Sequence, residues 1–243
     1  MGNERQGPYQ LLDTVTALFV TVLLVSNIAS AAKIVDLGIS FGGFPLAFDG
    51  GTFLFPLSYI FGDVLTEVYG YGKSRKVIWT GFGCAGLMSL TFWILGRLPG
   101  EAAWESIAGQ EAYEKILGSV GNGAIIVASL SAYWVGEFSN SYVLAKMKIA
   151  TKGRWLWTRT IGSTLVGEGL DTLLFVGIAT VLGVFPPEAM VSILVANYIF
   201  KVGVETVMTP VTYRLCSFLK RCERVDVYDY HTSFNPFNLE LRR

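Results

Sequence analysis

Two long runs without a charged side chain constrain the fold of this chain more than any other feature of its sequence. Residues 14–32 and residues 77–96 contain no Asp, Glu, Lys or Arg. A helix needs about 20 apolar residues to cross a hydrocarbon core about 30 Å thick, and both runs reach that length. Both are predicted to be transmembrane helices, and the first has too long an apolar part for a cleaved signal peptide.

Four further segments have the same length but carry one or two ionisable residues each. The chain of 243 residues is 52% hydrophobic and 16% charged, whereas roughly a quarter of residues are charged in a soluble domain. We therefore predict an all-α integral membrane protein, with six spans in one domain over residues 1–218 and a polar tail over residues 219–243. The four additional spans are predicted at residues 52–71, 124–145, 160–184 and 189–213.

Lysine and arginine are distributed unevenly between the two sets of connecting segments. They gather after the second span, between the fourth and fifth, and after the sixth, whereas the opposite loops hold only Lys33, Arg97 and Lys115. Because positively charged loops stay in the cytoplasm, both termini are predicted to be cytoplasmic. On the other side, residues 101–117 are predicted to form an interfacial amphipathic helix in preference to a substrate lid. The tail is expected to dock on its own chain or on a second copy.

The two halves of the chain share a weak internal similarity. An offset of 113 aligns residues 26–27 with 139–140, and an offset of 105 aligns residues 62–63 with 167–168. Because each half has three spans, related halves would lie in opposite orientations, as in transporters with a site at the midplane. We predict a 3+3 inverted repeat, with chance similarity as the alternative.

Ionisable and amide side chains inside the predicted spans form the candidate site. Charges at this depth are costly, and a residue of this kind indicates function by default. Six acids and one lysine cannot all be ionised in a low-dielectric interior, so a polar cavity is predicted near the midplane. Its aromatic walls and its carboxylates and amides suit a planar ligand rich in N–H donors. The predicted substrate-binding residues are Asn27, Tyr59, Asp63, Glu67, Trp134, Glu137, Asn140, Glu168, Asp171, Asn197, Tyr198 and Lys201.

Two alternatives for these residues stay open at this point. The polar groups can simply hydrogen-bond neighbouring helices together. Lys201 can neutralise Glu205 of the same span, since residues four apart share a helix face.

Several function classes are excluded or disfavoured by what the sequence contains. Acidic and basic residues balance at 19 each, so the basic excess of a nucleic-acid-binding protein is missing. Three cysteines in no ligand spacing, and one histidine in the tail, predict neither a metal, a disulfide nor a cofactor. The sequence lacks the H-E-x-x-H and G-x-S-x-G motifs, so we do not expect an enzyme.

A long ordered set of segments along the chain resembles one known family. The segments are residues 26–27, 55–70, 75–76, 154–157, 163–165, 167, 171–172, 197–198, 200–201 and 234–237. On these residues the chain is similar to the queuosine precursor transporters, which are six-span membrane proteins of the vitamin-uptake type. The resemblance implies import of a 7-deazaguanine base, namely 7-cyano-7-deazaguanine, 7-aminomethyl-7-deazaguanine or queuine, across the bacterial inner membrane.

The resemblance also implies roles for the candidate residues. Asp63 and Asp171 would accept the N–H groups of a guanine-like edge, and Lys201 would face the carbonyl oxygen of the ligand or hold Asp171. Tyr198 or Trp134 would stack on the base. The three asparagines that would orient it are Asn27, Asn140 and Asn197.

The transport mechanism has several open alternatives. The chain can be a substrate-binding subunit of an ATP-driven uptake system, since it has no nucleotide-binding loop of its own. It can also carry another planar nitrogenous base, and a passive channel is disfavoured. Proton exchange at Asp171 or Glu168 competes with facilitated diffusion as the driving step. The expected partners are membrane lipid and a second copy in a homodimer.

Overall fold

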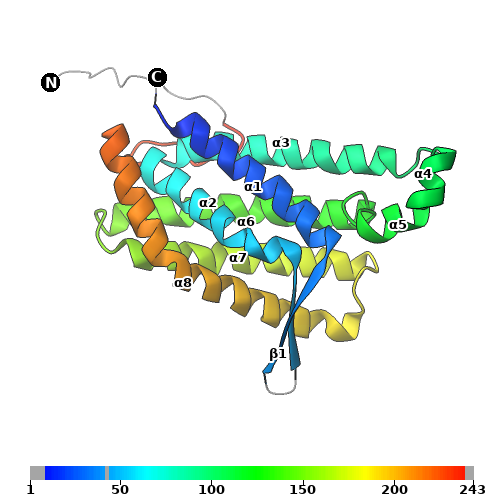
Figure 1. Cartoon of the computed structure of the whole chain (residues 1–243). Helices are drawn as coiled ribbons and strands as arrows, with labels where there is room; N and C mark the ends of the chain where they lie inside the picture. Colours follow the sequence, from blue (N-terminus) through cyan, green and yellow to red (C-terminus); the bar gives the residue numbers. More distant parts are fainter. Residues whose placement is uncertain (1–8, 42–43, 239–243) are drawn as a thin grey trace.

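Long helices lying roughly side by side form the body of the molecule (Figure 1). The computed structural model describes residues 9–41 and 44–238. The helices run antiparallel to their neighbours in the chain, as short connections between spans require. The long helices are α1 (Leu12–Ala32), α2 (Phe55–Tyr69), α3 (Tyr71–Leu95), α6 (Gly123–Ala150), α7 (Leu156–Val181) and α8 (Met190–Glu223).

The helical fold predicted from the apolar runs is confirmed. By length and hydropathy, α1, α3 and α7 each qualify as membrane-spanning helices. The last helix is longer than predicted, because α8 continues through Pro210 to Glu223 and takes in the first residues assigned to the tail. Crossing of the membrane by all six long helices, the inverted repeat and the cytoplasmic termini stay predictions.

The segment between the first two spans contains a β-hairpin that the sequence analysis did not predict. Strand β1 (Ile34–Phe41) pairs antiparallel with β2 (Phe44–Asp49), with Ile34 opposite Asp49. The hairpin projects from the bundle (Figure 1). Its β-branched and aromatic residues favour strands, and neither run is long enough for a transmembrane helix. A short 3-10 helix, η1 (Gly50–Phe53), then leads into α2.

The predicted interfacial helix over residues 101–117 is present as two short pieces. These are α4 (Ala102–Ile107) and α5 (Gly109–Ile116). The break falls at Gly109, whose φ of +74° is a left-handed conformation that favours glycine. A second 3-10 helix, η2 (Pro187–Ala189), precedes α8.

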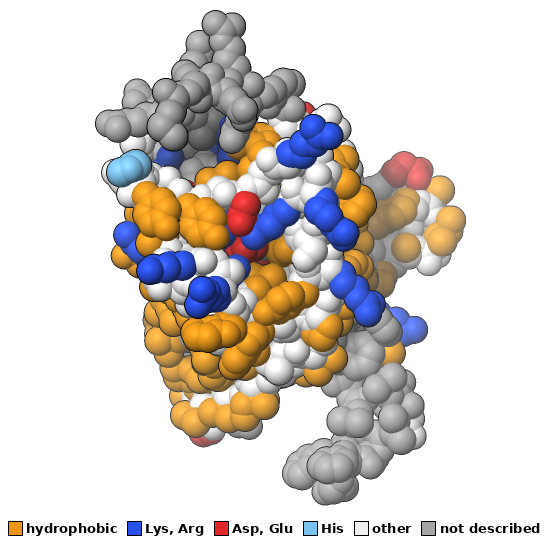
Figure 2. Space-filling model, turned by 90° about the vertical axis from the view of Figure 1, so that its left-hand side faces the viewer, with side chains coloured by type: hydrophobic (Ala, Val, Ile, Leu, Met, Phe, Trp, Pro, Cys, Tyr) orange, Lys and Arg blue, Asp and Glu red, His pale blue; other side chains and the backbone are white. Residues whose placement is uncertain are grey.

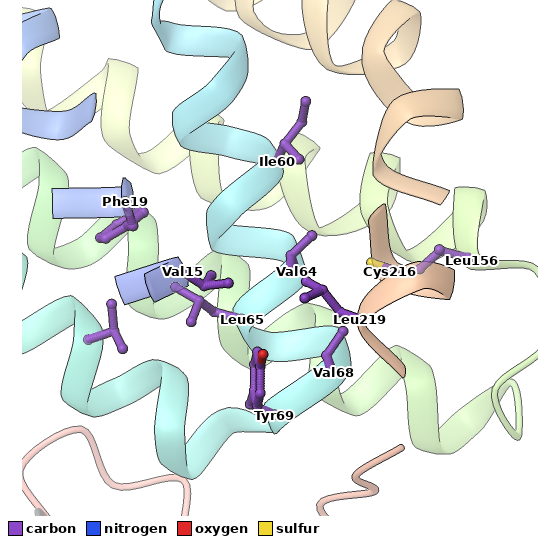
Figure 3. Packing of buried hydrophobic residues seen from close by; sticks show 11 residues of the cluster. Val15, Phe19, Ile60, Val64, Leu65, Val68, Tyr69, Leu156, Cys216 and Leu219 are labelled. Atoms are coloured by element: carbon purple, nitrogen blue, oxygen red, sulfur yellow. The ribbon is translucent and has the colours of Figure 1, made fainter. Parts of the chain in front are cut away.

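Helix α2 lies at the centre of the bundle. It packs against α1, α3, α6 and α8, and Figure 3 shows its Val64, Leu65 and Val68 surrounded by side chains of α1 and α8. Val64 and Val68 have no exposed surface. Because α2 packs against four other helices, the two carboxylates that it carries, Asp63 and Glu67, are buried in the interior of the bundle.

Helices α6 and α7 approach each other closely at two glycines. A Cβ atom on Gly136 would lie 2.7 Å from Cβ of Asp171, and one on Gly167 would lie 2.6 Å from Cβ of Asn140. Small residues allow such close helix contacts in membranes. The contact brings the polar residues of α6 next to those of α7.

The tail docks on its own chain, which was one of the two expected arrangements. Arg75 of α3 donates Nη1 to the carbonyl oxygens of Ser233 and Asn235, each at 2.8 Å. Trp79 Nε1 donates to Pro236 O at 2.8 Å. The tail therefore covers the faces of α3 and α6 at the end of the bundle where α1 begins and α8 ends (Figure 1).

The tail also caps the turn between α2 and α3. That turn consists of Gly70, whose φ of +81° is left-handed. The buried carboxylate of Asp229 accepts from the backbone N–H of Tyr71 at 3.0 Å, at the first residue of α3. A carboxylate at a helix N-terminus satisfies an otherwise unpaired N–H and interacts favourably with the helix dipole.

Candidate functional site

A cavity of about 390 Å³ lies between the helices and contains most of the predicted site residues. All six long helices contribute to its lining. Its volume is within the range of about 300–1,000 Å³ that is typical of small-molecule sites. The predicted residues that line it are Asn27, Tyr59, Glu137, Glu168, Asp171, Asn197 and Lys201.

The cavity occupies one half of the bundle. Its lining runs from Glu168 and Lys201 in the middle to Ser119 and Val120, which follow α5 and precede α6. The C-terminal half of α1 and the N-terminal half of α6 line it, and both lie toward the end that carries the hairpin, α4 and α5 (Figure 1). The opposite half of the bundle, where α1 begins and α8 ends, contains the buried ion network of Glu67 that is described below.

Lys201 of α8 forms ion pairs with two carboxylates of α7. Its Nζ lies 2.9 Å from Glu168 Oε2 and also donates to Asp171 Oδ2. These three side chains are about one-fifth exposed, toward the cavity that they line. Of the two roles expected for Lys201, the structure has the one that holds Asp171, and no intrahelical pair with Glu205 forms.

Glu137 is a lining carboxylate without a protein partner. No hydrogen bond or ion pair joins it to another residue in the described part of the chain, although it lies one helical turn from the Tyr133 ring that also lines the cavity. Asn27 uses its Nδ2 to donate to Leu23 O in its own helix at 2.7 Å, which leaves its carbonyl oxygen as an acceptor. The cavity therefore presents one unpaired carboxylate and amide oxygens to a ligand.

Asp63 and Asn140 lie beneath the large cavity and not on it. Asn140 Nδ2 donates to Asp63 Oδ1 at 2.9 Å, which joins α6 to α2. Both residues line a second, much smaller cavity of about 10 Å³. This cavity shares Tyr59, Glu137 and Glu168 with the large one, so the two are neighbours.

Glu67 lies one turn further along α2, in a buried ion network. Arg159 donates Nε and Nη2 to its two carboxylate oxygens at 2.8 and 2.7 Å, and Lys220 Nζ donates at 2.5 Å. Lys148 Nζ lies 3.6 Å from the same carboxylate and 2.6 Å from Asp226 of the tail. The network joins α2, α6, α7, α8 and the tail, so Glu67 faces these cations instead of a ligand.

Three members of this network lie beyond the predicted spans and have shifted pKa values. Burial lowers the pKa of Lys148, which the nearby Glu67 and Asp226 only partly offset, and the other two are Asp226 and Lys220. Burial alone would raise the pKa of Asp226, but hydrogen bonds from Lys148 and Lys220 outweigh it and hold the pKa below its ordinary value. Burial alone would lower the pKa of Lys220, but Glu67 and Asp226 outweigh it and raise that pKa. The shifts of Asp226 and Lys220 both favour the charged forms.

Basic side chains gather on the end of the molecule where the termini lie. Figure 2 views that end and shows Lys and Arg spread across it. The exposed members from the predicted cytoplasmic segments include Lys76, Lys146, Lys152, Arg154 and Arg214. This distribution agrees with the positive side of a membrane protein.

Comparison with known proteins identifies the family. The sequence model of the family described as "Putative vitamin uptake transporter" matches residues 49–215. The chain belongs to this family. A relative from Bacillus subtilis (strain 168), named "Probable queuosine precursor transporter", is 33% identical over 163 residues, or 67% of this chain and 69% of the relative. No solved structure matches the chain.

Membership of the vitamin uptake transporter family makes the chain a membrane transporter and agrees with the expectation that it is not an enzyme. The matched segment contains both cavities except for the residues that α1 contributes, and it contains Glu67, Lys148 and Arg159 of the ion network. The site described above thus lies in the part of the chain by which the family is recognised.

Besides Glu67, two further predicted residues of this vitamin uptake transporter line neither cavity. Trp134 packs against Trp79, Phe138 and the tail residue Phe237, with ring centroids 5.1–6.0 Å apart. Tyr198 donates its hydroxyl to Leu165 O at 3.0 Å, on the outer side of the contact between α7 and α8. Neither ring is placed to stack on a ligand in the large cavity, and with Glu67 they leave the proposed site.

Several lining residues of the transporter were missed. The hydroxyls of Ser26, Ser58 and Ser129 line the cavity, as do the rings of Tyr133 and Phe175. The spacing of four between Tyr133 and Glu137 is a usable signal, because residues four apart share a helix face. The serines gave no usable signal in the sequence, because a single hydroxyl in an apolar helix is common at helix contacts.

Proposed function

We propose that this transporter imports 7-deazaguanine bases, the precursors of queuosine, through the 390 Å³ cavity. The named Bacillus subtilis relative supports the class of substrate. The observation that carries the proposal is a cavity in which a carboxylate without a protein partner, amide oxygens and aromatic rings meet.

Glu137 is proposed to read the guanine-like edge of the base. That edge presents an N1–H and an exocyclic amino group side by side, and a carboxylate can accept both. Among the lining carboxylates, Glu168 and Asp171 are engaged by Lys201, whereas Glu137 is not. A base bound there would give this half-buried carboxylate the hydrogen bonds that it lacks within the described part of the protein.

Aromatic rings are proposed to hold the face of the base. Tyr59 and Tyr133 line the cavity near Glu137, and Phe175 lines it on α7. Stacking on an aromatic ring favours any flat heterocycle. The polar groups of the cavity must therefore select a deazaguanine over other bases. Asn27 and Asn197 are placed to supply those groups from α1 and α8.

The direction of transport follows from the two different ends of the bundle. The cavity lies toward the hairpin end, which the charge distribution predicts to be outside, and the Glu67 network closes the end predicted to be inside. We propose that the structure is the state that receives substrate from outside. Release to the cytoplasm would require the ion network to open, as in alternating access between helix groups.

The test measures queuosine in tRNA from cells that neither make nor import the precursor. Such cells expressing this chain are fed each deazaguanine separately, and we expect at least one of them to restore queuosine. Glu137→Gln should reduce restoration at least about tenfold, which corresponds to about 1.4 kcal/mol. A matched control is Glu188→Gln, because Glu188 is exposed in the loop before α8.

Protein abundance in the membrane is measured in parallel for every variant. If no deazaguanine restores queuosine although the protein is present at normal levels, the proposed substrate class is wrong. If restoration occurs but Glu137→Gln matches Glu188→Gln, the substrate class holds and the assignment of Glu137 is wrong.

A further inference from the structure

We propose that the small cavity between Asp63 and Asn140 binds a sodium ion. The 10 Å³ cavity lies on the packed side of the large one, and it is lined by residues of α2, α6 and α7. The proposal that the ion binds does not depend on which substrate is transported, whereas its link to uptake rests on the proposed function.

Two oxygen atoms in this cavity lack protein partners. Asp63 is 1% exposed, and its Oδ2 has no hydrogen-bond partner among the described residues, although its Oδ1 accepts from Asn140. Asn140 Oδ1 is buried and also lacks a partner. Burying such groups without compensation costs free energy, and each one in a native structure calls for a reason, such as a bound water molecule or ion.

The donor set matches a hard monovalent cation. The lining includes five residues with carboxylate, amide or hydroxyl oxygens on their side chains, namely Asp63, Asn140, Thr164, Glu137 and Glu168, and hard cations prefer oxygen ligands. In the described part of the chain, no three acidic, histidine or cysteine side chains are grouped as a metal site. Glu168 is already paired with Lys201, and the buried Oδ2 of Asp63 lies together with the neutral side chains of Asn140 and Thr164. This set suits Na⁺ better than a divalent ion, which takes more carboxylates.

The size of the cavity agrees with an ion stripped of water. A volume of about 10–15 Å³ on this measure holds about one water molecule. The cavity has about 10 Å³, so it has room for a small ion and none for a hydrated one or for a base. The ligand is thus distinct from the substrate of the large cavity.

Several acidic side chains lie close to the small cavity and would be stabilised by a cation. Asp63 interacts electrostatically with Glu205 of α8 and Glu137 of α6, and Lys201 is already paired with two other carboxylates. Glu205 is 1% exposed and neither of its carboxylate oxygens has a partner among the described residues. A bound cation would reduce the repulsion between these acids, since buried carboxylates need a counter-charge or a proton.

The position of the cavity links it to transport. Tyr59, Glu137 and Glu168 line both cavities. An ion in the small cavity would hold the side chain of Glu137, the carboxylate that we propose to bind the base, in one position. Binding of the ion and binding of the substrate would then each raise the affinity for the other. The proton exchange expected at Asp171 or Glu168 is less suited to this role, because Lys201 holds both.

The first experiment measures ion binding without substrate. Purified full-length protein in detergent is heated at constant ionic strength while choline is replaced by Na⁺. We expect the unfolding midpoint to rise by about 5 °C at saturating Na⁺, since a ligand bound to the folded state stabilises it. Asp63→Asn and Thr164→Val should each remove most of this rise. Asp13→Asn makes the same chemical change at an exposed residue and should keep it.

The outcome of this experiment depends only on Na⁺ binding, because no substrate is added. If the midpoint of the wild-type protein does not respond to Na⁺, the proposal is overturned. It is also overturned if Asp63→Asn responds as strongly as Asp13→Asn, because Na⁺ then binds elsewhere. If Asp63→Asn fails to fold, the conservative Thr164→Val variant gives the same comparison.

The second experiment separates this proposal from the substrate proposal. Initial uptake of a deazaguanine is measured in vesicles with Na⁺ or choline outside, and we expect uptake at least about tenfold faster with Na⁺. Uptake that is equal in both salts overturns the coupling and leaves the substrate class intact. Sodium-dependent stabilisation without uptake of any deazaguanine supports the ion site and overturns the substrate class.

Discussion

Arg159 of α7 holds the carboxylate of Glu67 of α2 with two parallel hydrogen bonds, at 2.8 and 2.7 Å, and both side chains are shielded from solvent. This fork geometry gives the pair its direction as well as its strength. The two helices belong to different halves of the chain, so the pair fastens the halves together at the end of the bundle opposite the cavity.

Removing the Glu67 charge should destabilise the protein strongly. In Glu67→Gln, Arg159, Lys148 and Lys220 lose their shared anion, and breaking a buried ion pair typically costs about 3–5 kcal/mol. The free energy of unfolding in detergent is the measurement. Glu111→Gln is the control, because Glu111 and Lys115 form a pair that is mostly exposed. Equal stability of the two variants would contradict a structural role for the network.

Substitution of Arg75 should release the tail. Arg75→Met keeps the length of the side chain but removes both hydrogen bonds to the tail carbonyls. Chymotrypsin should then cleave after Phe234 at least about tenfold faster, because local opening exposes the backbone to proteases. Cleavage is followed by mass spectrometry. Lys76→Met removes the same charge from the exposed neighbour and should leave the rate unchanged.

Loss of Lys201 should impair uptake more than abundance. Lys201→Met leaves Glu168 and Asp171 facing the cavity without their shared cation. We expect initial uptake to fall at least about tenfold, or about 1.4 kcal/mol. The double variant Lys201→Met with Asp171→Asn removes one of the stranded charges and should recover part of the thermal stability. A double variant less stable than the single one would exclude this interpretation of the ion pairs.

Acid should selectively weaken the contact between the tail and the bundle. The folded state holds the pKa of Asp226 below its ordinary value of 3.8. Its stabilising contribution is therefore complete above that pH and is lost as the pH falls further, through the folded-state value. The midpoint difference between wild type and Asp226→Asn should be largest at pH 7 and shrink below pH 3.8. A difference that stays constant into acid would show that the charge of Asp226 is not involved.

A methyl group on Gly167 should force α6 and α7 apart. Its Cβ would lie 2.6 Å from Cβ of Asn140, and overpacking of this kind typically costs about 1–3 kcal/mol. Gly177→Ala is the control on the same helix, because no atom lies within 4 Å of its added Cβ. The midpoint temperature of thermal unfolding should fall for Gly167→Ala. For Gly177→Ala it should stay the same or rise slightly.

The positions of the long helices followed well from the sequence, because an apolar run of the required length has few alternatives in a membrane protein. The grouping of Glu137, Glu168, Asp171 and Lys201 around one cavity also followed, since their depth along each helix was readable from the spacing. The hairpin did not follow, because a short alternating run gives a weaker signal than a long apolar one.

The failures within the site have a common physical cause. Helical spacing places Tyr59, Asp63 and Glu67 on one face of α2. Along the length of the helix, however, this face meets three different environments. These are the large cavity, the small one and the cationic network. Trp134 is adjacent to Tyr133 in the sequence and therefore about 100° away around α6, where it meets the tail. Which neighbour a helix face meets depends on packing between helices, which single-helix periodicity does not contain.

The docked tail has a consequence for the biosynthesis of the protein. Chains are made from the N-terminus, so every long helix emerges before the residues that complete the ion network. Lys148 finds Asp226 and the carbonyl of Val227 only after α8 has been made, and Arg75 waits for residues 233–235. The end of the bundle that holds the Glu67 network is therefore the last part of the molecule to be completed, and a chain that lacks residues 226–238 would lose the contacts of Lys148 with Asp226 and Val227.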